Sequence, residues 1–147
     1  MKIYSLSAVL LFFIVSFSSH ASVDKIDNIR NAAINAYNTK DIDTLMSFWH
    51  SKGKMLGPET IDGYSEIKSH YKTSFADSHF NRISMKSEGI DGIGDFFYDS
   101  GTMSILDEEG NKLITGCYVL LYVKSGNSYK TWREWFYPTC LNTRQHE

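Results

Sequence analysis

The stretch from Gly116 to Pro138 constrains the fold most, because it holds two long strand-like runs around a short turn. The turn is Gly126-Asn127, and both residue types tolerate the positive φ that tight hairpins need. The flanking runs are rich in Val, Leu, Tyr and Trp, which fit a pleated surface. The stretch therefore predicts a β-hairpin in the last third of the chain.

Centring the hairpin on that turn fixes which side chains share a face, since successive strand residues point to opposite sides. The first face then carries Cys117, Val119, Leu121, Val123, Lys130, Trp132, Glu134 and Phe136. The second face carries Tyr118, Leu120, Tyr122, Thr131, Arg133 and Trp135. Neither face is polar throughout, so we expect a helix to cover the first face and a partner subunit to cover the second, the face of Tyr118, Leu120 and Tyr122.

The first 21 residues have the layout of a secretory signal peptide. Lys2 precedes an apolar run over residues 8–17, and a small-x-small site ends at Ala21. The apolar run is short for a membrane span, although an uncleaved N-terminal anchor is the alternative. We expect cleavage after Ala21, one domain over residues 22–147, and a periplasmic or secreted protein without membrane contact.

The charge balance excludes one class of partner, and the cysteines leave a question open. The formal net charge is −2 and no basic run occurs, so nucleic-acid binding is not expected. An exported protein can form a disulfide between Cys117 and Cys140. The predicted register separates them along the strand, so a bridge needs the chain to turn back after Pro138. Two buried thiols are the alternative.

The first half of the chain predicts three helices. Residues 24–38 carry apolar side chains at helical spacing, and Ser22 can cap them. Asp41 caps a second, shorter helix whose apolar face ends at Trp49, and Gly53 ends that segment. A short strand follows over residues 54–56, and Asp62-Gly63 starts a third helix with Tyr64, Ile67, Tyr71 and Phe75 on one face.

The second half reads as strands over residues 82–90, 95–106, 112–124 and 129–138. Gly101 lies inside the second of these runs and predicts a bulge or bend. Helices followed by a long antiparallel meander indicate an α+β fold.

With that layout, residues 26–138 resemble the nuclear transport factor 2-like superfamily, and within it the SnoaL-like and ketosteroid-isomerase-like proteins. Three groups of motifs carry the resemblance: Tyr37 to Asp43 at the first helix break, Gly57-Pro58 with Asp62-Gly63 and Ile67, and Asp99-Ser100-Gly101, Gly116-Cys117-Tyr118 and Tyr129 to Glu134 in the strands. The resemblance implies a cone, or cystatin-like roll, in which three N-terminal helices pack in the concavity of a curved antiparallel sheet. A pocket lies at the open end of this cone. The resemblance also implies a homodimer through the sheet, which family members commonly form.

Ketosteroid isomerase offers a sharp comparison, because its acid–base groups are physically understood. The resemblance places its general-base aspartate at Gly57, its oxyanion-hole acid at Val119 and its first-helix tyrosine at Ala33. None of these side chains transfers a proton. We therefore do not expect steroid isomerisation by that mechanism.

Glu134 is the first candidate for chemistry, because the resemblance makes its strand face the wall of the pocket. Apolar neighbours raise the pKa of a carboxyl group, which suits a general acid or base. An ion pair with Arg82 or Lys130 is the alternative. On the same face, Trp132 is a candidate ligand platform, and the face also contributes Val119 and Leu121 as ligand-binding candidates.

The helices add ligand-binding candidates at Tyr37, Trp49 and Tyr71, and a second catalytic candidate at His50 beside a helix end. No pair among His50, His70 and His79 has the spacing of a zinc site, and no HExxH or CxxC motif occurs. We expect neither a metal nor a cofactor.

Two functions follow from these residues. The first is binding of a small apolar or amphipathic molecule in the pocket, with cofactor-free acid–base chemistry of the isomerase, dehydratase or cyclase type. The alternative is a non-catalytic binding or dimeric assembly domain with a vestigial pocket. An open cavity lined by Glu134 and a second polar group would favour the first.

Overall fold

The structure is a computed structural model, and it describes residues 7–77, 79, 81–138 and 140, with side chains from residue 21 onward. The elements follow in the order α1 (Ser7–Asn38), α2 (Ile42–Ser47), β1 (Trp49–Leu56), β2 (Ile61–Asp62), α3 (Tyr64–Ala76), β3 (Arg82–Ile93), β4 (Phe96–Leu106), β5 (Lys112–Ser125) and β6 (Ser128–Tyr137). The α+β prediction is confirmed.

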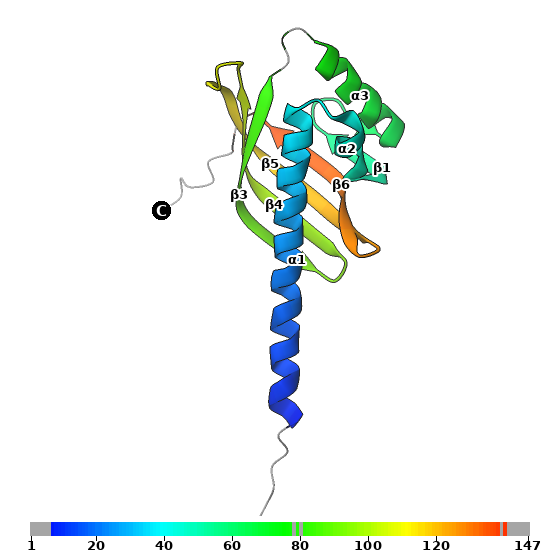
Figure 1. The fold of residues 1–147 in the computed structure, drawn as a ribbon, viewed down its shortest axis with the longest axis vertical. Helices are drawn as coiled ribbons and strands as arrows, with labels where there is room; N and C mark the ends of the chain where they lie inside the picture. The colour runs from blue at the N-terminus through cyan, green and yellow to red at the C-terminus, as the bar shows by residue number, and fades with distance from the viewer. Residues whose placement is uncertain (1–6, 78, 80, 139, 141–147) are drawn as a thin grey trace, which may run out of the picture.

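The strands form one six-stranded sheet in the order β2-β1-β6-β5-β4-β3. Strands β3 to β6 make the predicted antiparallel meander, whereas β1 joins β6 in parallel and β2 pairs with β1. Figure 1 shows the curved sheet with α1 lying across one face and the α2–α3 layer at one end of that face. This layout is the predicted roll of helices inside a curved sheet.

Helix α1 starts earlier than the sequence predicts. The helix runs through Ser22 without a break, so Ser22 is not its N-cap. The Ser22 hydroxyl instead accepts a hydrogen bond of 3.1 Å from Tyr129 in β6. None of the helices in the described part of the chain combines the length and apolar character that a membrane span needs.

Helix α2 begins as predicted and ends sooner. The Asp41 side chain caps it by accepting a hydrogen bond of 3.1 Å from the Thr44 amide. Strand β1 then starts at Trp49, so Trp49 and His50 lie on a strand rather than on a helix. The prediction that His50 sits at a helix end is wrong, because the chain turns at Phe48 to pair with β6.

The bulge near Gly101 lies in the neighbouring strand. The register between β3 and β4 shifts between Ser87 and Gly89, opposite Gly101 and Ser100. A Cβ atom on Gly101 would lie 2.1 Å from the Lys86 carbonyl oxygen, so only glycine fits there. The glycine therefore lets β3 fold closely over β4 at this point.

The hairpin turn is confirmed, but the register beyond it differs from the prediction. Gly126 and Asn127 form a two-residue connection, with Gly126 at φ 61° and Val123 opposite Lys130 as predicted. A shift between Leu121 and Tyr122 then leaves an extra residue at Trp132 in β6. From there on, Leu120 faces Glu134, whereas the sequence paired Val119 with it.

This β-bulge reverses the alternation of β6, so Glu134 lies on the opposite face of the hairpin from Val119 and Leu121. Tyr118, Leu120 and Tyr122, which we assigned to a partner-facing surface, are at most 6% exposed and lie in the core. Val119 and Leu121 are the residues on the outer side of the sheet, with Tyr98 of β4 opposite Leu121. Charged substitutions at Leu120 or Tyr122 would therefore disrupt the core rather than test a dimer.

Two hydrophobic clusters hold the layers together. The larger packs α1 onto the sheet and contains Ile26, Phe97, Met103, Tyr118, Leu120, Tyr122 and Tyr129. The second joins the three helices to β1 and contains Ala36, Leu45, Met46, Trp49, Ile67 and Tyr71. Burial of this apolar surface is the main contribution to folding.

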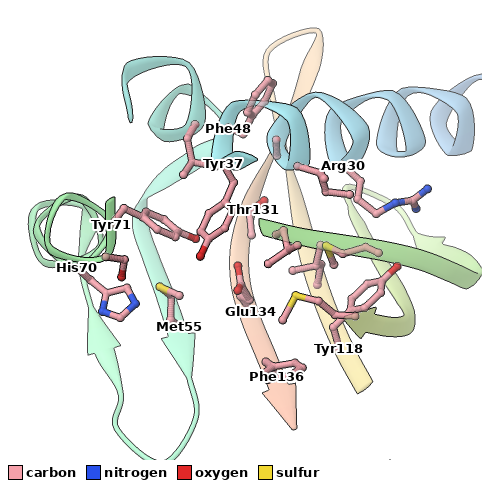
Figure 2. Close-up of a pocket in the computed structure, with 18 of the residues that line it drawn as sticks. Arg30, Tyr37, Phe48, Met55, His70, Tyr71, Tyr118, Thr131, Glu134 and Phe136 are labelled. Atoms are coloured by element: carbon pink, nitrogen blue, oxygen red, sulfur yellow. The ribbon is translucent and has the colours of Figure 1, made fainter. Parts of the chain in front are cut away.

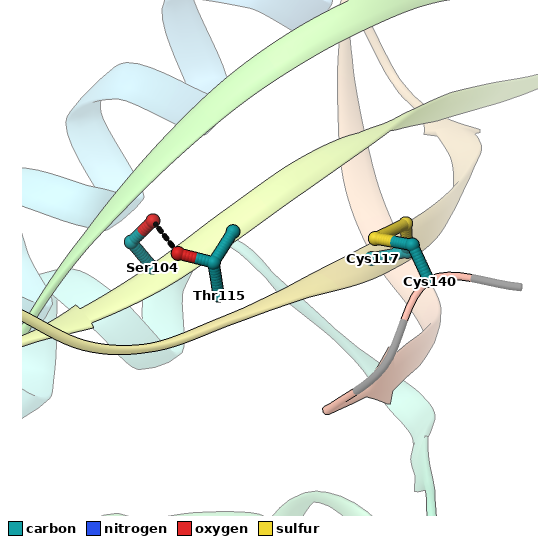
Figure 3. The surroundings of a disulfide bond; sticks show 4 residues. All are labelled: Ser104, Thr115, Cys117 and Cys140. Atoms are coloured by element: carbon teal, nitrogen blue, oxygen red, sulfur yellow. Dashed lines mark hydrogen bonds between the residues drawn. A yellow bond between two sulfur atoms is a disulfide. The ribbon is translucent and has the colours of Figure 1, made fainter. Parts of the chain in front are cut away.

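A disulfide settles the cysteine question. Cys117 in β5 and Cys140 beyond the end of β6 are bonded, with their Cα atoms 5.1 Å apart (Figure 3). The chain does turn back after Pro138, which brings Cys140 beside the strand. On the other edge of β5, the Thr115 hydroxyl shares a cross-strand hydrogen bond of 2.8 Å with the Ser104 hydroxyl of β4.

Candidate functional site

A cavity of about 420 Å³ lies between the helices and the concave face of the sheet. Residues of both hydrophobic clusters line this cavity, which lies between the two clusters. Figure 2 shows side chains from α1, α3, β1, β5 and β6 pointing into this space. The lining is mostly apolar and aromatic, as is usual for sites of small molecules.

Four of the predicted site residues line the cavity, namely Glu134, Tyr37, Trp49 and Tyr71. The other four do not. The β6 bulge puts Glu134 on the inner face, whereas Val119 and Leu121 lie on the outer face, where Trp132 packs against Phe96 with ring centroids 5.8 Å apart. His50 accepts a hydrogen bond of 3.1 Å from the Lys52 amide within β1 and lies outside the lining.

The Glu134 carboxyl points into the cavity (Figure 2) and has no hydrogen bond or ion pair among the described residues. Burial alone raises the pKa of Glu134 from 4.5 to about 7. The two cations that we considered as partners are engaged elsewhere. Arg82 donates to the Glu108 carbonyl, and Lys130 donates to the Ser47 carbonyl. Glu134 is therefore an unpaired carboxyl group that changes charge near neutral pH.

Two tyrosine hydroxyls accompany this carboxyl. Tyr37 of α1 and Tyr71 of α3 pack edge to face, with ring centroids 6.0 Å apart, and Figure 2 shows both hydroxyls directed toward Glu134. Burial first, and then the charge of Glu134, raises the pKa of both phenols. The two phenols therefore stay neutral and can donate hydrogen bonds, while Glu134 can accept or give a proton.

A buried ion pair lies beside the cavity and contributes Arg30 to its lining. Arg30 of α1 donates to Asp99 of β4 over 2.7 Å, and both side chains are at most 6% exposed. Ser87 and Tyr118 also donate to Asp99, over 2.6 and 3.1 Å. Burial lowers the pKa of Arg30, but the hydrogen bond and charge of Asp99 more than offset this and keep it protonated.

Sequence reasoning missed this pair, although a signal for it exists. Arg30 lies one turn after Ile26 on the face of α1 that packs inward, where a charge needs a buried partner. Asp99 lies between Phe97 and Gly101 on the inward face of β4, where an unpaired carboxylate is equally unfavourable. Two opposite charges at apolar positions indicate an ion pair, but their contact needs the fold.

The described residues hold no group of three or more metal-ligating side chains. His70, Asp77 and His79 are exposed lining residues and form part of the rim of the cavity. The Glu134 carboxyl can support proton transfer, with Tyr37 and Tyr71 as hydrogen-bond donors.

Comparison with solved structures decides the fold. A candidate dehydratase of the nuclear transport factor 2-like family from Streptomyces avermitilis superposes with a TM-score of 0.73 at 15% identity, over 82% of this chain and 98% of that one. A protein of the same family from Shewanella oneidensis gives 0.68 at 16% identity, over 78% and 97%. The chain has the nuclear transport factor 2-like fold.

Further neighbours carry a related description. A protein with a cystatin-like fold from Nostoc punctiforme superposes with a TM-score of 0.69 at 11% identity, over 98% of this chain and 97% of that one. No family model and no curated protein matches the sequence. A nuclear transport factor 2-like fold supports many functions, so the function of this chain has to be argued from its own cavity.

Proposed function

We propose that the chain binds a small apolar or amphipathic molecule in the cavity and that Glu134 exchanges a proton with it, without a cofactor. The observation that carries this proposal is the unpaired Glu134 carboxyl in an apolar cavity of about 420 Å³. A carboxyl group whose pKa lies near 7 can serve as acid or base at neutral pH. A candidate dehydratase among the structural neighbours is consistent with such chemistry.

The alternative of an assembly domain with a vestigial pocket has less support. A vestigial pocket has no need to keep a carboxyl group desolvated, which costs free energy of folding. Here the cavity is open and holds Glu134 together with Tyr37 and Tyr71. This combination of an open space and several polar groups favours ligand chemistry.

The test is mass spectrometry of small molecules that co-purify with the protein. Ala33 lines the cavity and its neighbour Ala32 is exposed on the same helix, so Ala33→Leu and Ala32→Leu form a matched pair. We expect a compound that is retained by the parent and by Ala32→Leu and is lost from Ala33→Leu. Equal retention by both variants would argue against binding in this cavity.

We also propose that the protein is exported and that residues 1–21 are removed. The Cys117–Cys140 disulfide supports this, because such bonds persist in oxidising compartments. The side-chain contacts described between α1 and the sheet, from Ser22 and Val23 onward, would remain after cleavage. N-terminal sequencing of the exported protein should start at Ser22, and a chain starting at Met1 in a membrane fraction would contradict the proposal.

A further inference from the structure

The charges around the cavity do not cancel. Its lining carries one guanidinium, that of Arg30, and two carboxyl groups, those of Glu134 and Asp77. The Arg30 charge is already balanced, because Arg30 pairs with Asp99 at 2.7 Å and also with Asp27. Two imidazoles, those of His70 and His79, lie at the rim, but the described lining residues include no lysine or arginine that is left to balance Glu134 when it is ionised.

The groups that face Glu134 are neutral and mostly aromatic. Tyr37 from α1, Tyr71 from α3 and Tyr122 from β5 all interact electrostatically with it, and each is a phenol whose pKa is raised. Tyr122 also interacts with Arg30 and Asp99, so it lies between the two polar parts of the wall. The position beside Glu134 therefore has a carboxylate and hydroxyl oxygens, but no positive charge.

Aromatic rings enclose this position on the helix side. Tyr37 and Tyr71 meet edge to face at an interplanar angle of 76°, and Trp49 lies 6.5 Å from Tyr71 between ring centroids. Figure 2 shows Phe136 on the opposite side of Glu134. The rings form an apolar wall, and their hydroxyl oxygens can accept hydrogen bonds from an ammonium group that pairs with Glu134.

From this arrangement we infer that the ligand carries a cationic amine, which pairs with Glu134 while its apolar body fills the rest of the cavity. An ammonium group supplies the charge that Glu134 lacks and three donors for the carboxylate and phenol oxygens. An anionic ligand would meet Glu134 as a like charge, and a neutral one would leave the carboxylate unpaired. The inference rests on the proposed function, since it names the ligand class of the same cavity.

Three probes that share one apolar body test the inference, namely 4-phenylbutylamine, 4-phenylbutanol and 4-phenylbutanoate. Calorimetric titration at pH 8 keeps Glu134 ionised, because its pKa is about 7. We expect the parent protein to bind the amine at least about tenfold more tightly than the alcohol, and the carboxylate most weakly. Glu134→Gln should bind the amine and the alcohol equally.

Glu88→Gln is the matched control, because Glu88 is exposed on β3 and lies outside the lining. This control should keep the parent preference for the amine, and melting curves show whether each variant is folded. The amine-to-alcohol ratio of the parent tests the inference even if Glu134→Gln does not fold.

The outcomes separate the inference from the proposed function. Binding of the alcohol as tight as that of the amine would overturn the amine inference and leave the ligand cavity supported. A preference for the amine that survives in folded Glu134→Gln would also overturn it, because the amine would then be held elsewhere. Failure of all three probes to bind would count against both the inference and the proposed function.

Discussion

Glu134 combines its proposed role in the cavity with a cost in stability. Its pKa is about 7 in the folded chain and 4.5 as the ordinary value, so the folded state holds its proton more strongly than the unfolded state. The contribution of Glu134 to stability is therefore most favourable below about pH 4.5, falls as the pH rises toward 7 and levels off above that.

Glu134→Gln removes this titration and keeps the shape of the side chain. At pH 8 we expect the variant to be more stable than the parent by at most about 3 kcal/mol, and near pH 4 to be equally stable. Thermal melting of both proteins from pH 4 to 8 measures the difference. Destabilisation of roughly 3–5 kcal/mol would instead mean that Glu134 is half of an ion pair.

Asp99 stabilises the fold, in contrast to Glu134, because it balances the charge of the buried Arg30 guanidinium. Asp99→Ala leaves the Arg30 guanidinium without its main partner and leaves Tyr118 without its acceptor. We expect a loss of roughly 3–5 kcal/mol in the free energy of unfolding, measured by urea denaturation.

The control for this substitution is Asp95→Ala. Asp95 pairs with Lys124 at 3.6 Å, and both side chains are more than half exposed. Its loss should cost at most about 1 kcal/mol, because exposed ion pairs contribute little. Equal effects of the two substitutions would show that the Arg30–Asp99 pair is not a major part of the core.

At the scale of single elements, one extra residue in β6 decides which side chains reach the cavity. Thr131 and Glu134 both face inward although they are three positions apart, which an unbroken strand does not allow. The bulge lies where β6 pairs with β5 on one side and with β1 on the other, and the pairing with β1 shifts in the same region. Arg133 donates to the Lys52 carbonyl there, which ties the bulge to β1.

The second bulge, between β3 and β4, allows a prediction about backbone contact. Gly101→Ala would place a Cβ atom 2.1 Å from the Lys86 carbonyl oxygen, so the two strands would have to separate. We expect a loss of roughly 1–3 kcal/mol in the free energy of unfolding. Gly89→Ala is the control, because nothing lies within 4 Å of the added atom. Similar melting temperatures for the two variants would contradict this account.

At the scale of the whole molecule, the outer face of the sheet has no covering layer among the described residues. Phe96 and Tyr98 of β4 are 43% and 45% exposed. They pair across the sheet with Val123 and Leu121, and Trp132 packs on Phe96. Contiguous apolar patches of this kind mark contacts between proteins.

We propose that two copies of the chain pair through this patch rather than through Leu120 and Tyr122. Tyr98→Lys combined with Leu121→Asp should convert a dimer to a monomer, as measured by light scattering. Leu113→Lys is the control, because Leu113 is 55% exposed near the start of β5 and lies outside the patch. A monomeric parent protein would contradict the proposal.

The sequence by itself determined the features that neighbouring residues encode. The hairpin turn at Gly126-Asn127, the cap at Asp41 and the start of α3 after Gly63 all appear as predicted. Each depends on φ preferences or on hydrogen bonds within a few residues. The α+β class followed from the order of these elements, and the placement of Glu134 on the cavity side followed from the resemblance.

Only the tertiary structure decided the contacts between distant segments. The bulge at Trp132 separated the face of Glu134 from that of Val119 and Leu121, since pairing with both neighbouring strands sets the register of β6. The turn at Phe48 ends α2 before His50, so His50 lies in β1. The direction of the chain after Pro138 places Cys140 within bonding distance of Cys117. Alternation along a strand predicts faces only while the strand is regular, and the sum of long-range contacts decides where it is not.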